Sequence, residues 1–272
     1  MKKTLIALLI CGFIGMNLIA DSMDSRTITV GDTAITVYRD NTPNTEPDKP
    51  TIDNNVFALH KNGKIILVNA GLGGEDGFLK RFIADGHKPE DVSAVLINVM
   101  GDDNIGGLLS GRATSTRNEG RGYIVTMPGA VFPNATLYIS KIEKEFWDNY
   151  PLVRSLGAPP HITRQVTSAY RDRIVTFDFD AEILPGITAI EAVKQRPEQV
   201  YSTTIFATRD IMFIGGFTRF AMDTTDAVQQ HKVWLQNAAD KKLFVAGSRL
   251  PFPAIGKLTS DNKEGYTFTE VK

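Results

Sequence analysis

Residues 94–108 read Ala94-Val-Leu-Ile-Asn-Val-Met-Gly-Asp-Asp-Asn-Ile-Gly-Gly-Leu108, and this stretch decides the fold. An apolar run typical of a buried strand gives way to small and polar residues, and apolar residues resume at Ile105 beside a Gly-Gly pair. The pattern predicts a strand that passes directly into a helix. Chemistry in α/β proteins is usually placed at the carboxyl end of such a strand, so we expect functional residues just before Ile105.

The composition is that of an ordinary globular protein and predicts one large domain. The chain has 272 residues, of which 42% are hydrophobic and 22% are charged. A net charge of −1 at pH 7 and a pI near 6.4 give no electrostatic reason to expect binding to nucleic acid or to an acidic membrane.

The first 20 residues predict export. Met1-Lys-Lys3 followed by the apolar run 4–20 is typical of a secretory signal that is cleaved after Ala20, which leaves 21–272 as a periplasmic or secreted domain. An uncleaved N-terminal anchor is the alternative, because Leu18 is larger than the small residue that is usually preferred two places before the cleavage site. No other membrane contact is predicted. The one cysteine, Cys11, lies in this segment, so the mature protein would have no disulfide, thiol nucleophile or cysteine ligand for zinc.

Apolar periodicity and turn residues predict a mixed α/β domain. Two hairpins are expected, at 27–38 and at 56–68, and Asn62-Gly63 is a strong turn signal for the second. A polar surface loop at 41–53 separates them. Further strands are expected at 132–140, 174–179, 184–190, 203–207, 211–216, 243–248 and 265–270, and helices at 76–85, 141–149, 162–172 and 227–240.

The stretch 94–108 resembles the signature loop of the metallo-β-lactamase superfamily, whose His-x-His-x-Asp-His motif supplies zinc ligands between such a strand and helix. In register, the family histidines fall on Val99, Gly101 and Asn104, and the family aspartate falls on Asp103. The resemblance extends over 27–271 and is closest to the methyl-parathion-hydrolase and lactonase branch. It implies an αββα sandwich.

The remaining ligand positions of the family are changed as well. They carry Gln195, Gln199, Gly216 and Arg249 in this chain, and Asn69 stands where the family has the aspartate of an Asp-Thr-Gly turn. Neither valine nor glycine has a side-chain donor for zinc, and amides are poor substitutes for imidazole. The resemblance therefore implies a metal-site scaffold without its ligands, and we expect no metal and no other cofactor.

The four histidines offer no replacement site. His60, His87, His161 and His231 lack ligand spacing such as His-x-His. We expect His87 to be an exposed loop residue before the central strand, and His231 to face the core from its helix.

The sequence contains candidate residues for two metal-independent chemistries, one based on serine and one on carboxylates. Neither Ser202 nor Ser248 lies in a nucleophile-elbow sequence. Asp102 and Asp103 are adjacent and should point apart, so we expect one to cap a helix and the other to have a buried partner.

Residues 109–132 are rich in Gly, Ser, Thr and Arg and predict a long loop. The Gly111–Gly122 segment is either a surface excursion or a lid whose Arg112, Arg117 and Arg121 face the pocket mouth.

These features predict an exported pseudoenzyme that binds a small, anionic molecule or a protein partner; a hydrolase of esters or lactones and a purely structural role are the alternatives. The sequence does not predict an oligomeric state. We expect Arg249 to pair with a buried Asp103, either as a plug or as part of a binding site, so that Arg249→Ala would cost roughly 3–5 kcal/mol. The residues expected to line the pocket are Asn69, Asn98, Asp103, Asn104, Lys194, Gln195, Gln199 and Arg249, and Arg196 would add positive charge.

Overall fold

A computed structural model describes residues 24–40, 53–118, 122–149, 161–192, 203–215, 225–260 and 266–271. The predicted signal segment and residues 193–200 lie outside this set. Of the predicted loop at 41–53, only Asp53 is described, and it is buried rather than on the surface. Within the described residues, no helix is both long enough and apolar enough to cross a membrane.

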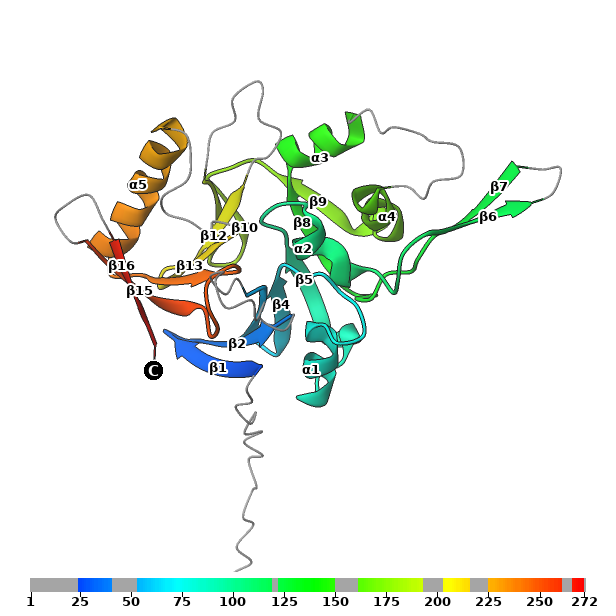
Figure 1. Ribbon diagram of the computed structural model, residues 1–272. Helices are drawn as coiled ribbons and strands as arrows, with labels where there is room; N and C mark the ends of the chain where they lie inside the picture. The colour runs from blue at the N-terminus through cyan, green and yellow to red at the C-terminus, as the bar shows by residue number, and fades with distance from the viewer. Residues whose placement is uncertain are drawn as a thin grey trace, which may run out of the picture.

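Two seven-stranded sheets form the centre of the described structure (Figure 1). The first sheet contains, in spatial order, β1 (Ser25–Val30), β2 (Thr33–Arg39), β3 (Asn55–Lys61), β4 (Lys64–Val68), β5 (Val92–Leu96), β8 (Thr136–Ser140) and β9 (Ile174–Phe177). The second contains β10 (Ala181–Leu184), β11 (Ile187–Glu191), β12 (Thr204–Ala207), β13 (Ile211–Ile214), β14 (Phe244–Gly247), β15 (Ile255–Ser260) and β16 (Tyr266–Glu270).

Helices cover the outer faces of both sheets, with α5 on one side and α1, α3 and α4 on the other (Figure 1). Their bounds are α1 (Phe78–Ala84), α2 (Asp102–Ile105), α3 (Lys141–Asn149), α4 (Ile162–Ala169) and α5 (Thr225–Asp240), with short 3-10 turns at Pro89–Asp91, Gly106–Leu108 and Arg171–Arg173. The apolar residues fall into three clusters, one between the sheets and one under the helices on each side. The predicted αββα sandwich is therefore confirmed.

Local signals placed the first hairpins correctly. Asn62 and Gly63 have φ values of 52° and 72°, the left-handed conformation that a tight type I′ turn requires, and they join β3 to β4. Gly86, with φ of 89°, ends α1 as predicted. The predicted strand at 184–190 is instead divided at Gly186 (φ 77°), where β10 turns into β11, and β15 was not predicted.

Parallel pairing brings the candidate site together. In the first sheet β4, β5, β8 and β9 run parallel, and in the second sheet β13 and β14 do. The segments that follow β5, β13 and β14 therefore leave from the carboxyl ends of their strands, where side chains of an α/β site gather.

The predicted loop at 109–132 is wrong for residues 114–118 and 122–126, which form a two-stranded antiparallel ribbon. β6 (Thr114–Asn118) pairs with β7 (Gly122–Thr126), and the pair extends away from the sandwich (Figure 1). The β-branched residues of the two strands, which are threonine, isoleucine and valine, favour extended backbone. This preference outweighs the tendency of the flanking glycines to form a loop. The base of the ribbon is fixed by a bridge between Leu109 and Ala130 and by the Ala113 N–H, which donates to Gln165 Oε1 at 2.7 Å.

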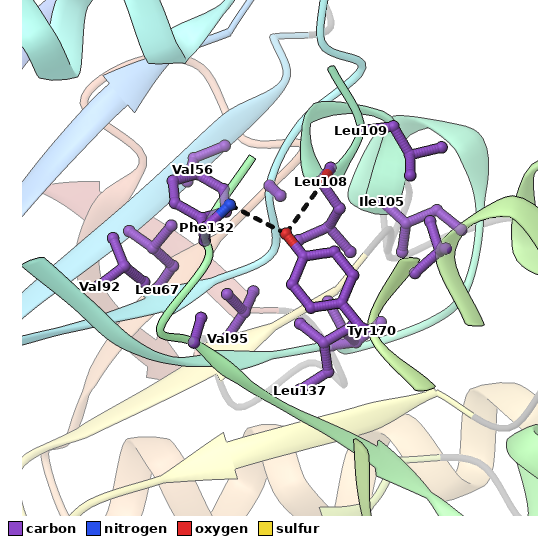
Figure 2. Packing of buried hydrophobic residues seen from close by; sticks show 14 of the residues in the cluster. Val56, Leu67, Val92, Val95, Ile105, Leu108, Leu109, Phe132, Leu137 and Tyr170 are labelled. Carbon is purple, nitrogen blue, oxygen red and sulfur yellow. Dashed lines mark hydrogen bonds between the residues drawn. The ribbon is translucent and has the colours of Figure 1, made fainter. Parts of the chain in front are cut away.

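A buried tyrosine holds the two chain segments at the root of the ribbon. The Tyr170 hydroxyl donates to the Leu108 carbonyl at 3.0 Å and accepts from the Phe132 N–H at 3.1 Å (Figure 2). Burial raises the pKa of Tyr170 to about 12, so the neutral hydroxyl is maintained. This contact ties the ribbon to α4 and to the core under the first sheet.

Candidate functional site

The centre of the site is an ion pair between Arg249 and Asp103. Arg249 follows β14, Asp103 lies in the first turn of α2, and the Arg249 Nη2 donates to Asp103 Oδ2. The predicted contact is thus present. The side chains are 27% and 23% exposed, however, so the pair is only partly buried and the expected cost of 3–5 kcal/mol for its loss is too high.

The turn that carries Arg249 is fixed to the start of β3. Asn55 donates from its backbone N–H to the Ser248 carbonyl at 2.8 Å and from Nδ2 to the Leu250 carbonyl at 2.8 Å. The Asp53 carboxylate accepts from the Phe252 N–H at 2.7 Å. These contacts on both sides of Arg249 hold its backbone in one place, which gives the guanidinium a defined direction.

The loop that carries Asp103 is fixed by a second set of polar contacts. Asn54 Nδ2 donates to the Asp103 carbonyl at 2.8 Å and to Asp40 Oδ2 at 3.1 Å. The buried Asp40 carboxylate also accepts from the N–H groups of Leu72, at 2.6 Å, and of Phe78, at 2.9 Å. Burial raises the pKa of Asp40. None of these supporting residues was predicted, because their partners are far apart in the sequence.

Glu143 also holds the segment that carries Asp103, through its contact with Met100. This buried carboxyl group on α3 accepts from the Met100 N–H at 2.7 Å and from the Trp147 Nε1 at 3.3 Å. Burial raises the pKa of Glu143 to about 7. Its role in this geometry is to position the 99–104 loop.

Asn69 and Asn98 lie beside the site but use their amides within the protein. Asn69 Nδ2 donates to Asn98 Oδ1 at 3.0 Å, and the Asn98 N–H donates to Asn69 Oδ1 at 3.1 Å. Asn98 Nδ2 then reaches the second sheet, where it donates to the carbonyls of Thr204, at 2.5 Å, and Phe213, at 3.4 Å. Both side chains are fully buried. This arrangement favours a structural link between the sheets over contact with a ligand.

Asn104 and Asp102 differ from their predicted roles. Asn104 was expected to join the ion pair, but its Nδ2 donates to the Val99 carbonyl at 3.2 Å, and its buried Oδ1 has no partner among the described residues. The amide is instead used to close the loop. Asp102 is exposed and caps no helix, because the N-cap of α2 is Gly101, which has no side chain.

The residues present do not fit the zinc centre that the fold family implies. Val99 and Gly101 have no donor, and the Asp103 carboxylate already accepts from a guanidinium. A Cβ atom at Gly101 would lie 2.7 Å from Asp103 Oδ1, so a histidine there would displace that carboxylate. In the part of the chain that the structure describes, no group of three or more His, Cys, Asp or Glu side chains converges as metal ligands would.

The described histidines have neighbours of their own. His60 Nε2 bonds to Thr36 Oγ1 at 2.9 Å, and its ring lies 5.1 Å from that of His87, which is half-buried rather than exposed as predicted. His161 caps α4 and stacks on Trp147. The side chain of His231 is not described.

Of the two candidate serines, only Ser248 is described, and it has no base beside it in the described structure. The Ser248 hydroxyl is buried and has no partner among the described residues, and Ser202 lies outside them. The predicted pocket residues Lys194, Gln195 and Gln199 also lie outside the described set, as does Gly216.

A groove of about 510 Å³ lies at the base of the ribbon, and none of the ion-pair residues lines it. Its apolar walls come from Leu72, Phe78, Leu79, Leu109 and Val131, and its charged residues are Glu75 and Arg112. Arg112 therefore lies beside this groove. The predicted lid role of Arg117 gains no support, since the ribbon that carries it extends away from the sandwich (Figure 1). Arg121 lies outside the described residues.

Comparison with known proteins gives the same fold. No family model and no curated protein matches the sequence. Among solved structures, the dizinc quorum-quenching lactonase AidC, in complex with its product N-hexanoyl-L-homoserine, is 18% identical and superposes with a TM-score of 0.68 over 92% of this chain and 98% of its own. The hydrolase AbOPH of the β-lactamase superfamily is 20% identical, with a TM-score of 0.68 over 93% and 99%. A "probable metal-dependent hydrolase" from Staphylococcus aureus is 14% identical, with a TM-score of 0.64 over 90% and 100%. The chain therefore has the metallo-β-lactamase fold.

Proposed function

We propose that this protein is an exported pseudoenzyme of the metallo-β-lactamase fold, in which Arg249 binds the carboxylate of a small anionic molecule. The observation that carries this proposal is the ion pair itself, which puts a guanidinium against the one carboxylate kept from the family motif. A cation that is part of the chain then stands where the family motif uses metal ions, and it can attract an anion but cannot generate hydroxide from water.

The geometry of Arg249 supports a site that binds an anion over an ion pair that merely fills the space of the metal site. A guanidinium has five N–H donors, and Asp103 accepts from Nη2, while about a quarter of the Arg249 side chain is open to solvent. Partial burial removes some of the water around the Arg249 guanidinium and lowers the pKa of Arg249. An arriving carboxylate would restore the hydrogen bonds that water no longer supplies, in the bidentate geometry that arginine favours.

Titration calorimetry with two probes tests this proposal. The probes are hexanoate and N-hexanoyl-L-homoserine, the carboxylate that the AidC structure contains as its product. We expect both to bind, and we expect Arg249→Met combined with Asp103→Leu to weaken binding at least tenfold, about 1.4 kcal/mol. Arg164→Met, which removes an exposed arginine on α4, serves as the matched control.

Two results would overturn the proposal. One is equal affinity in the parent and in the double variant. The other is hydrolysis of the N-hexanoyl lactone or of simple esters by the parent, which would favour the alternative of a hydrolase.

Export is part of the proposal and depends on residues 1–20. Fractionation of cells that produce the full chain should recover a periplasmic or secreted protein with Asp21 at its N-terminus. Retention in the cytoplasm, or a membrane-bound product that starts at Met1, would contradict the cleaved signal.

A further inference from the structure

We infer that the β6–β7 ribbon is a dimerisation arm that docks in the groove at the base of the same ribbon in a second copy of this chain. The starting observation is the ribbon's isolation. It is a two-stranded sheet that pairs with neither seven-stranded sheet, and such a pair of strands is at best marginally stable in water on its own.

The two strands of the ribbon differ sharply in polarity. β6 contains only Thr, Ser, Arg and Asn, whereas β7 presents apolar side chains to solvent. Tyr123 is 47% exposed, Ile124 is 55% exposed and Val125 is 42% exposed. Because successive residues of a strand face opposite sides, Tyr123 and Val125 make one face of β7 apolar and Ile124 does the same for the other. A surface loop would not need three such residues in a row.

The groove offers a matching apolar surface. Leu72, Leu79 and Val131 line it, and Ile83, one turn beyond Leu79 on α1, extends the apolar strip and is itself exposed. Leu72 is also exposed. The groove lies where the chain enters and leaves the ribbon, since Ser110, Gly111 and Arg112 line it as well.

The position of the groove favours a second copy of this chain over an unrelated partner. If two ribbons lie side by side in opposite directions, the outer part of each meets the base of the other. Both contacts then form together around a two-fold axis, and the assembly closes as a dimer. The ribbon root is held firmly by Tyr170, so the arm is presented in a fixed direction.

The charges are complementary in the same arrangement. Arg117 lies opposite Tyr123 in the ribbon ladder, and Glu75 lies on the groove. Both residues are exposed, and neither forms an ion pair with any other described residue. Docking would bring Arg117 of each copy to Glu75 of the other.

Light scattering coupled to size exclusion tests this inference on the mature chain. We expect the parent to elute with twice the chain mass, and Ile124→Lys to elute as a monomer with an unchanged thermal melt. Val233→Lys, at a position on α5 that is 73% exposed, is the matched control and should remain dimeric. Arg117→Glu should weaken the dimer at least tenfold, and Arg117→Glu combined with Glu75→Arg should restore it.

Three results would overturn the inference. A parent that is monomeric at all accessible concentrations would show that the ribbon serves another partner. A dimer that survives Ile124→Lys would place the interface elsewhere. A charge-swapped double variant that stays monomeric while Arg117→Glu alone dissociates the dimer would show that the ribbon does not dock in the groove.

Discussion

Replacing Arg249 with methionine should destabilise the protein by an amount set by how far the ion pair is buried. Exposed pairs contribute about 0.2–1 kcal/mol, and breaking a fully buried pair costs about 3–5 kcal/mol. The Arg249 and Asp103 side chains are each roughly a quarter exposed, so a value of about 2 kcal/mol is expected for Arg249→Met. The cost arises because the Asp103 carboxylate loses its cationic partner and stays partly desolvated.

Urea unfolding of a double-mutant cycle measures this effect. With a slope near 3 kcal/mol per molar urea, Arg249→Met should lower the midpoint by about 0.7 M. Adding Asp103→Leu should recover at least half of the loss, because the stranded charge is removed. Arg209→Met breaks the exposed pair with Asp210 and serves as the control, with an expected change below about 0.5 kcal/mol.

The result that would refute this reasoning is additivity. If the double variant loses as much stability as the two single variants together, the two side chains are not coupled. An Arg249→Met variant as stable as the parent would lead to the same conclusion.

Three further variants test the contacts around the site. Tyr170→Phe removes a hydroxyl that bonds two backbone groups and should cost about 1–3 kcal/mol in urea unfolding; an unchanged midpoint would contradict the role of Tyr170 at the ribbon root. Asn98→Ala leaves the Asn69 amide and the Thr204 carbonyl without their partner, so it should lower the free energy of unfolding by about 2–4 kcal/mol. A loss below about 1 kcal/mol would exclude Asn98 as a link between the two sheets. The folded-state pKa of Glu143, about 7, exceeds its unfolded value, so its contribution is fully present below about pH 4.5 and is lost as the pH rises to 7, by up to about 3 kcal/mol. Glu143→Gln should remove this slope from the pH dependence of unfolding, and a slope that persists would assign it to another group.

The sequence predicted the parts of the fold that are specified locally or through the family resemblance. Asn62-Gly63 requires a left-handed turn wherever it stands, so the hairpin of β3 and β4 could be predicted from those residues alone. The αββα layering came only from the resemblance, because the alternation of strand and helix does not determine which sheet a strand joins.

The ribbon was missed because its signals conflict. Thr114 to Asn118 is polar throughout, and glycines flank it, which is typical of a loop. The strand forms because β7 supplies β-branched and aromatic residues for cross-strand pairing. Such a pairing is visible only when the partner strand is known.

The ion pair was predicted because both residues occupy family ligand positions, which converge on one point. The contacts that support it were not. Asn54, Asn55 and Glu143 act on residues 43 to 195 positions away, and no local pattern distinguishes a buried amide or carboxyl group that orients a loop from one that faces solvent.

The central claim is that a guanidinium–carboxylate pair has replaced the metal centre, and metal analysis of the purified protein tests it most directly. Protein from cells grown with added zinc should contain far less than one equivalent of zinc or iron per chain after dialysis, and restoring histidines at Val99, Gly101 and Asn104 should not produce zinc-dependent esterase activity. About one equivalent of metal that survives dialysis, and that is lost in Asp103→Ala, would contradict the claim.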